Sequence, residues 1–219
     1  MRQIAPSILS ADFLRLGEAV DLLNEHADLV HVDVMDGTFV PNISFGFPVM
    51  AALARKAVRP LDVHLMIVHP EKYLRRFAEA GAGWISFHLE AAEEAGADPV
   101  ALLREIRSYG VRAGLAIDPD VPVEQLFPYL EEADFVLVMT VFAGFGGQKL
   151  VPESYDRIAA VKAEIDRRNL HTLIEADGGI GAGNIGALEA AGASVFVAGA
   201  SVFNAPDPVE AIRQLKECN

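Results

Sequence analysis

Two short stretches of the chain carry histidine and aspartate at alternate positions. They read HVDVM (31–35) and DVHLM (62–66). Residues two apart on a β-strand point to the same face of a sheet, so each stretch presents an imidazole, a carboxylate and a thioether together. Imidazoles and carboxylates bind divalent transition metals and also transfer protons. Either stretch alone could hold an ordinary core histidine, but matching triplets on two strands favour a reactive site.

A third stretch, IEADGGI (174–180), contributes Glu175 and Asp177 to one face of a strand and contains two glycines after the aspartate. An aspartate before a glycine turn is common, so this stretch alone would not indicate chemistry. Combined with the first two stretches, it completes a mixed nitrogen and oxygen set that suits zinc, ferrous iron, manganese or cobalt. We therefore predict a site for one divalent metal ion, formed by His31, Asp33, His64 and Asp177.

Two further carboxylates accompany these candidate ligands. Asp62 shares a strand face with His64, and Glu175 shares one with Asp177. A metal-bound histidine usually donates its second N–H to an acceptor, which fixes the orientation of the ring. We expect Asp62 and Glu175 to be such acceptors. The single cysteine, Cys218, provides no thiolate set that would narrow the choice of metal.

Three glycine-rich segments, 143–148, 177–181 and 198–201, follow the last three predicted strands. Glycine lets the backbone approach a ligand closely and turn its N–H groups toward an anion. None of the segments has the Walker or G-x-G-x-x-G pattern, so a nucleotide is not indicated. Each could be an ordinary turn, but three at successive strand ends favour a phosphate site. The residues expected to contact a phosphorylated substrate there are Gly144, Phe145, Gly146, Gly147, Gly178, Gly179, Gly199, Ala200 and Ser201.

The methionines near these motifs allow two interpretations. In an apolar strand, a methionine is usually a core residue. Beside the metal site, the same side chains would form a dry, polarizable wall next to a developing enediolate; the three concerned are Met35, Met66 and Met139. The remaining histidines lack a comparable set of neighbours and are expected to be structural or surface residues: His26, His69, His88 and His171.

Eight short apolar runs rich in β-branched residues recur along the chain and predict the strands that position these groups. Nearly continuous apolar runs are typical of parallel strands that are covered on both faces. The runs span 4–9, 29–35, 61–67, 84–89, 111–117, 134–140, 172–177 and 194–199.

Segments with helical apolar spacing lie between most of these runs. Such alternation over 219 residues predicts one domain, residues 1–219, folded as a (β/α)8 barrel (TIM barrel), with a doubly wound parallel sheet as the main alternative. In a barrel, reactive groups belong at the carboxyl ends of the strands. The predicted helical segments are 13–25, 70–80, 99–109, 152–168 and 206–217.

The overall composition restricts the partners of the chain. With 18 Lys and Arg against 31 Asp and Glu, the formal charge is −13, which disfavours nucleic acid and anionic membranes. An anionic substrate must then be held by local groups. No apolar run approaches the roughly 20 residues that span a bilayer, and the first residues lack a signal-peptide core. We therefore expect a cytoplasmic protein with neither a membrane nor a nucleic-acid partner.

Several motifs, in order along nearly the whole chain, give it a resemblance to a known family. They are APSILSADF, HVDVMDGTFVPNISFG, PLDVHLMIVHPEKY, GFGGQK, EADGGI and VAGASVF. With these motifs the chain resembles the ribulose-phosphate 3-epimerase family. The resemblance implies a barrel isomerase of the pentose phosphate pathway that interconverts D-ribulose 5-phosphate and D-xylulose 5-phosphate.

The resemblance also implies roles for individual residues. One divalent metal ion is expected on His31, Asp33, His64 and Asp177, with Asp33 and Asp177 as the acid and base that transfer a proton through an enediolate. Ser7 and His64 are expected to touch the substrate, a ketose phosphate, while the glycine turns hold its phosphate. We also expect a homo-oligomer.

Three places depart from the family pattern. Phe142 and Ala143 replace the usual Asn-Pro, Ala176 replaces a common Val, and Ala200 stands where Ser is usual. The altered loop leaves open a six-carbon substrate, allulose 6-phosphate, for the same 3-epimerase chemistry. A metal-independent phosphate-binding barrel enzyme and a non-catalytic sugar-phosphate binding protein are the competing functions.

Overall fold

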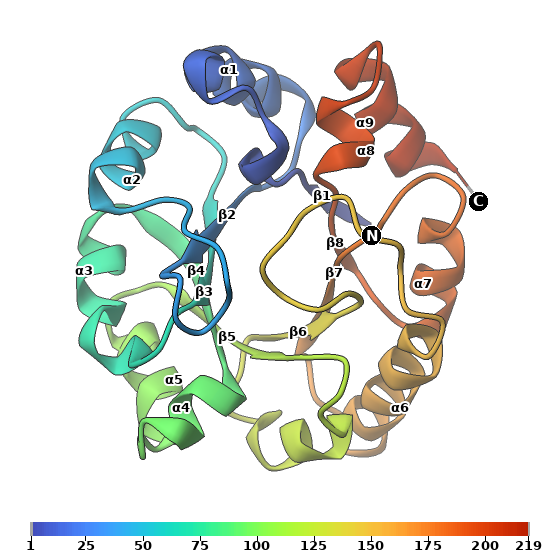
Figure 1. Ribbon diagram of the computed structural model, residues 1–219. Coiled ribbons are helices and arrows are strands. Elements are labelled where there is room, and N and C mark those ends of the chain that lie inside the picture. Colours follow the sequence, from blue (N-terminus) through green and yellow to red (C-terminus); the bar gives the residue numbers. More distant parts are fainter. Residues whose placement is uncertain (1, 219) are drawn as a thin grey trace.

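The strands of the computed structural model, which describes residues 2–218, surround the centre of the view in Figure 1. They form one parallel sheet in the order β1-β8-β7-β6-β5-β4-β3-β2. A parallel bridge between Ser7 and His31 joins its two edges, so the sheet closes into the predicted (β/α)8 barrel. The strands are β1 (Gln3–Ala5), β2 (Val30–Met35), β3 (Leu61–Met66), β4 (Ala82–His88), β5 (Arg112–Ile117), β6 (Phe135–Met139), β7 (Leu173–Asp177) and β8 (Val195–Val197).

Helices form the outer ring around these strands (Figure 1). All five predicted helical segments are helical, although the first two begin with a short 3-10 helix. Two of the helices start with a proline behind an aspartate cap, a favourable arrangement because proline needs no N–H partner at that position. The α-helices are α1 (Leu16–His26), α2 (Phe47–Ala54), α3 (Leu74–Glu79), α4 (Leu89–Glu94), α5 (Pro99–Ser108), α6 (Ser154–Arg167), α7 (Ile185–Ala191), α8 (Ala200–Phe203) and α9 (Pro208–Glu217). The 3-10 helices are η1 (Ile8–Ser10), η2 (Phe13–Arg15), η3 (Pro70–Lys72) and η4 (Val123–Tyr129).

The first strand is shorter than the apolar run 4–9 predicted. Pro6 has no N–H to donate to a neighbouring strand, and β1 ends at Ala5. The Ser7 hydroxyl then accepts the N–H of Leu9 and starts η1. This change of direction leaves Ser7 at the end of the barrel where the carboxyl ends of the strands meet.

Apolar side chains fill the space between the sheet and the helices, and a second group fills the amino-terminal half of the barrel. Within that second group, the Trp84 and Phe135 rings pack 4.9 Å apart. The barrel interior is therefore solid below the level of the histidines and aspartates. The second group consists of Ala5, Leu29, Trp84, Phe135, Val195 and Val197.

Gly114 on β5 makes room for this packing. It pairs with Phe135 on β6, and a Cβ at position 114 would overlap the Phe135 ring. We expect Gly114→Ala to lower the free energy of unfolding by about 1–3 kcal/mol, because the buried ring has no free space to move into. Urea denaturation measures this. The matched control is Gly183→Ala, whose added Cβ meets nothing within 4 Å; equal stability of both variants would contradict the explanation.

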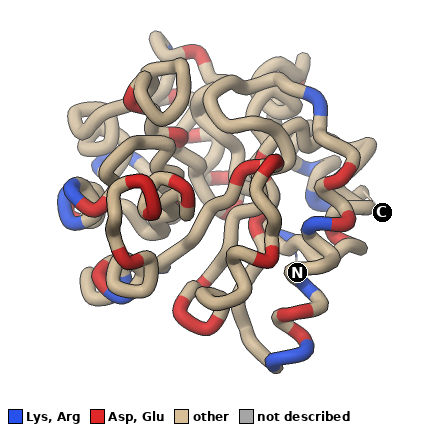
Figure 2. The backbone as a smooth tube through the Cα atoms, turned by 60° about the horizontal axis from the view of Figure 1, so that its bottom comes forward, with Lys and Arg blue, Asp and Glu red and all other residues tan. Residues whose placement is uncertain are grey.

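The charge of the chain is spread over its surface. Acidic positions outnumber basic ones on the face shown in Figure 2. Among the described residues, no helix combines the length and apolar character needed to cross a membrane.

Candidate active site

Strands β2 and β3 are neighbours, and their register places the two alternating stretches side by side. His31 lies opposite Asp62, Asp33 opposite His64, and Met35 opposite Met66. Both triplets face the inside of the barrel near the carboxyl ends of the strands, where their polar atoms are buried. The fold thus brings the two stretches together in the predicted way.

The four candidate metal ligands converge on one point. The Nε2 atom of His31 lies 3.3 Å from Asp33 Oδ1 and 3.8 Å from Asp177 Oδ2. The Nδ1 atom of His64 lies 3.4 Å and 3.6 Å from the same two oxygens. These four atoms all lie within 4.8 Å of one another, so a single ion could contact them all.

The electrostatics of the cluster favour a bound cation. Burial would lower the pKa of His31, but the charges of Asp33 and Asp62 outweigh it and raise that pKa well above its usual value. Burial opposes the charged form of His64 too, yet the nearby carboxylates of Asp177 and Asp33 raise its pKa. The buried Nδ1 of His64 has no hydrogen-bond partner. Two imidazoles and two carboxylates that attract positive charge fit a divalent metal ion.

Asp62 contacts the ring nitrogen of His31 that faces away from the ligand cluster, as expected. Its Oδ2 lies 2.6 Å from the Nδ1 of His31, so that Nδ1 carries the proton and Nε2 is left to face the ligand cluster. Glu175 is farther away, with Oε1 3.7 Å from the same nitrogen. Burial and the nearby charge of Asp62 raise the pKa of Glu175 well above its usual value, and the shorter contact makes Asp62 the acceptor for His31.

Asp33 uses its two oxygens differently. Oδ1 faces His31 and His64, while Oδ2 accepts a 2.5 Å hydrogen bond from the Ser7 hydroxyl. Burial would raise the pKa of Asp33, but the hydrogen bond of His31 and the positive charges of both histidines keep it far below its usual value. Asp33 is therefore ionised and held in one orientation.

Asp177 lies at the last position of β7 and is fixed through its backbone. Its carbonyl accepts the N–H of Thr140, and the Thr140 hydroxyl donates to the carbonyl of Gly178 at 2.5 Å. Gly178 has a φ of +124°, and a Cβ there would overlap the Val141 side chain. The turn after Asp177 therefore requires glycine, and it aims a carboxylate that is 15% exposed into the open end of the barrel.

A cavity of about 290 Å³ opens above the four ligands. His31 and His64 lie beneath it, fully buried. No Lys or Arg belongs to its described lining, so an anion in it would be held by backbone N–H groups and hydroxyls. The predicted site residues that line the cavity are Ser7, Asp33, Met35, Met66, Met139, Gly144, Phe145, Gly146, Gly147, Asp177, Gly178, Gly179, Gly199, Ala200 and Ser201.

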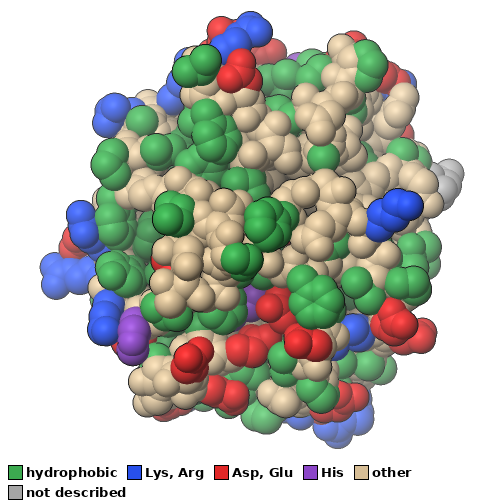
Figure 3. Space-filling model, in the orientation of Figure 1, with side chains coloured by type: hydrophobic (Ala, Val, Ile, Leu, Met, Phe, Trp, Pro, Cys, Tyr) green, Lys and Arg blue, Asp and Glu red, His purple; other side chains and the backbone are tan. Residues whose placement is uncertain are grey.

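Two loops cover the open end of the barrel, one after β2 and one after β6 (Figure 1). The Asn42 side chain donates to the carbonyl of Gly144 at 2.9 Å and ties the two loops together. The Gln148 side chain donates to the carbonyls of Phe142 and Phe145. In Figure 3, separate hydrophobic side chains lie among backbone and other atoms over the centre of this face.

Sequence reasoning missed some of the residues at this end of the barrel. No spacing rule connected Ser10 or Asn184 to the cavity, because they reach it through irregular loops. His88, expected to be structural or on the surface, is fully buried with its Nε2 2.8 Å from the Nε2 of His64. The alternation of Trp84, Ser86 and His88 on β4 could have placed His88 inside the barrel.

Comparison with known proteins agrees with this geometry. A family model described as "Ribulose-phosphate 3 epimerase family" matches residues 3–203. The ribulose-phosphate 3-epimerase of Synechocystis sp. is 47% identical over 210 residues, covering 95% of this chain and 90% of the relative. That of Mycobacterium tuberculosis is 43% identical over 213 residues, with coverages of 97% and 91%. The chain belongs to the ribulose-phosphate 3 epimerase family.

As a member of the ribulose-phosphate 3 epimerase family, the chain is an epimerase, and the expected resemblance is confirmed. Its barrel also resembles enzymes of other kinds. KGPDC from Streptococcus mutans superposes with a TM-score of 0.72 at 15% identity, over 99% of this chain and 96% of that one. At so low an identity, the likeness shows the shared fold alone.

Proposed function

We propose that this epimerase interconverts D-ribulose 5-phosphate and D-xylulose 5-phosphate with one divalent metal ion, zinc, ferrous iron, manganese or cobalt, on His31, Asp33, His64 and Asp177. The observation that carries the proposal is the convergence of two aspartates and two buried histidines on one point at the floor of the cavity. The names of the related enzymes support the choice of substrate.

Asp33 and Asp177 transfer the proton at the third carbon of the sugar. Inversion of that carbon requires removal of its proton from one face and return of a proton to the other, so two acid or base groups are needed. Asp33 lies on β2 and Asp177 on β7, and β1 and β8 lie between these strands, so the carboxylates approach from different sides. One begins as base and the other as acid, and the roles exchange with the direction of the reaction.

A divalent ion held by these four residues would supply Lewis-acid stabilisation of the negative charge that develops on the substrate. Asp62 keeps His31 oriented, and the Ser7 hydroxyl keeps Asp33 oriented as it gives up or takes the proton. Ser7, which lines the cavity, is also next to the sugar, and His64 lies beneath the same part of the cavity. The cavity wall beside the planar enediolate consists of Met35, Met66 and Met139, each at most 4% exposed, and excludes water from it.

The phosphate of the substrate binds at the glycine turns on the other side of the cavity. The Ser201 hydroxyl supports this assignment, since its oxygen is buried at the cavity lining without a hydrogen-bond partner. Gly179 lets the turn after β7 touch the loop after β6, because a Cβ there would lie 2.5 Å from the backbone nitrogen of Leu150. Both turns thus line the same cavity, where their backbone N–H groups are the donors proposed for the phosphate.

Replacing Ser201 by alanine is expected to raise the KM for the sugar phosphate about tenfold with little change in kcat, since a hydrogen bond to a charged phosphate is lost in ground and transition state alike. Steady-state kinetics measure this. The matched control is Ser108→Ala on the outer helix α5. An unchanged KM in folded Ser201→Ala protein would contradict a phosphate contact.

Proton NMR of D-ribulose 5-phosphate in heavy water tests the function as a whole. We expect the signal of the proton on the third carbon to disappear and D-xylulose 5-phosphate to appear, while heat-denatured protein does neither. The same experiment with allulose 6-phosphate compares the turnover of this six-carbon substrate with that of the pentose phosphate. Absence of both exchange and product with the pentose phosphate would refute the proposal.

A further inference from the structure

His88 lies directly behind His64, on the side away from the metal ligands. It is the last residue of β4, fully buried, and its Nε2 is 2.8 Å from the Nε2 of His64. The two ring planes differ by 22° and the ring centres are 5.0 Å apart. The distance between the ring centres is close to the 2.8 Å N···N contact plus the distance from each ring centre to its own nitrogen. The two rings therefore meet through their Nε2 atoms and share one hydrogen bond.

The direction of this hydrogen bond follows from the metal site of the proposed function, on which the inference rests. His64 turns Nδ1 toward Asp33 and Asp177, so a neutral, ligating His64 carries its proton on Nε2. That N–H must donate to the Nε2 of His88. A neutral His88 that accepts through Nε2 must carry its own proton on Nδ1.

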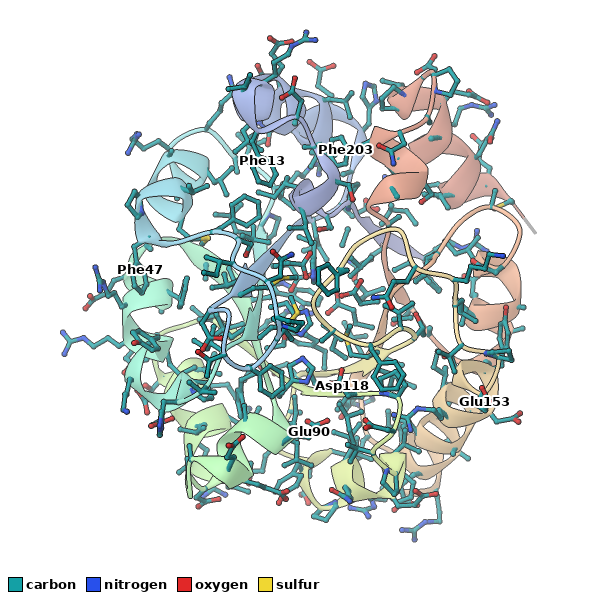
Figure 4. The ribbon with its side chains drawn as sticks, in the orientation of Figure 1. Phe13, Phe47, Glu90, Asp118, Glu153 and Phe203 are labelled. Carbon is teal, nitrogen blue, oxygen red and sulfur yellow. The ribbon has the colours of Figure 1, made fainter. Side chains whose placement is uncertain are left out.

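The Glu90 carboxylate faces the N–H on Nδ1 of His88 and is placed to accept its hydrogen bond. Its Oε2 lies 3.7 Å from the Nδ1 of His88, and neither of these buried atoms has a hydrogen-bond partner. Its other oxygen, Oε1, accepts the N–H of Asp118 at 2.8 Å, which anchors the carboxylate at the start of α4. The labelled side chains of Glu90 and Asp118 lie near each other in Figure 4. The Phe39 ring, centred 4.8 Å from that of His88, covers the imidazole.

We propose that His88 and Glu90 form a positioning relay that fixes the tautomer and orientation of His64 and strengthens its hold on the metal. Glu90 keeps the proton of His88 on its Nδ1, and His88 in turn keeps the proton of His64 on its Nε2. The relay performs for His64 what Asp62 performs directly for His31. His88 is not among the residues that line the cavity, so it is a positioning residue.

The same residues could be read as a second metal site, because ligand atoms of His88, Glu90 and Asp118 also lie within 4.8 Å of one another. A metal ion on Nδ1 would force the proton of a neutral His88 onto Nε2. Two N–H groups would then oppose each other across the 2.8 Å contact with His64. Occupation of the first site therefore excludes the second, and one ion per chain is expected.

Zinc affinity of the metal-free full chain, measured by competition with a chelator, tests the relay. We expect His88→Leu to weaken zinc binding about 10–100-fold and the isosteric Glu90→Gln about tenfold. The matched control for the second is Glu71→Gln, because Glu71 pairs with His69 at the same two-residue spacing and is 28% exposed against 24% for Glu90.

Imidazole ¹⁵N NMR of zinc-loaded wild-type protein provides a second readout that does not depend on whether a variant folds. The expected result is a proton on Nε2 of His64 and on Nδ1 of His88, with one zinc ion per chain. The reverse tautomer at His88, two zinc ions per chain, or wild-type affinity in folded Glu90→Gln protein would each overturn the relay alone. Failure of the wild-type protein to bind zinc would overturn the proposed metal site as well.

Discussion

Asp33→Asn and Asp177→Asn should each lower the rate of epimerisation by about 10²–10⁴-fold, because an amide can neither remove the proton nor return one. Both carboxylates meet at the cavity floor, and the described lining contains no third Asp or Glu that could replace either of them. Steady-state rates in both directions measure the effect. Asp21→Asn, on an exposed position of α1 that pairs with Lys56, is the matched control.

Isotope exchange gives this prediction a sharper form. If each aspartate serves one face of the sugar, a variant that retains some proton transfer will exchange the third-carbon proton of one epimer only, and the two variants will differ in which epimer that is. Circular dichroism and thermal unfolding establish that each variant is folded. Near-normal turnover by either folded variant would refute the two-aspartate scheme.

The barrel and the alignment of its reactive strands could be predicted because they depend on short-range rules. Alternation fixes which side chains share a face, and it placed His31, Asp33 and His64 inside the barrel correctly. The apolar runs fixed the number of strands, since eight runs gave eight strands. Where a local rule opposed the pattern, the pattern failed: Pro6 ended β1 early, although the apolar run continued.

The parts that could not be predicted depend on contacts between distant segments. The role of His88 becomes visible only when the register of β3 and β4 brings its ring against that of His64. The two loops over the cavity are joined by Asn42 and Gly144, which lie about a hundred residues apart in the chain. No periodicity encodes such a contact.

Removal of the metal is expected to have an effect as large as the loss of an aspartate. A Lewis acid contributes several kcal/mol, and each 1.4 kcal/mol corresponds to tenfold in rate, so chelation should lower turnover by about 10³-fold or more. Zinc, ferrous iron, manganese or cobalt should restore it. Magnesium is the control ion, because a site with two imidazole ligands suits it poorly. Full activity in protein shown by elemental analysis to be metal-free would refute this part of the proposal.

Thermal unfolding separates this explanation from a purely structural effect of the chelator. Without a cation, Asp33 and Asp177 leave two carboxylates close together in a buried cluster, so readded metal should raise the Tm in proportion to its binding. At a free concentration 100 times the Kd, binding to the folded state alone stabilises it by about 2.7 kcal/mol. Asp33→Asn removes one ligand and should shrink this shift, whereas Asp21→Asn should leave it unchanged. A shift of equal size in both variants would show that the ion binds elsewhere.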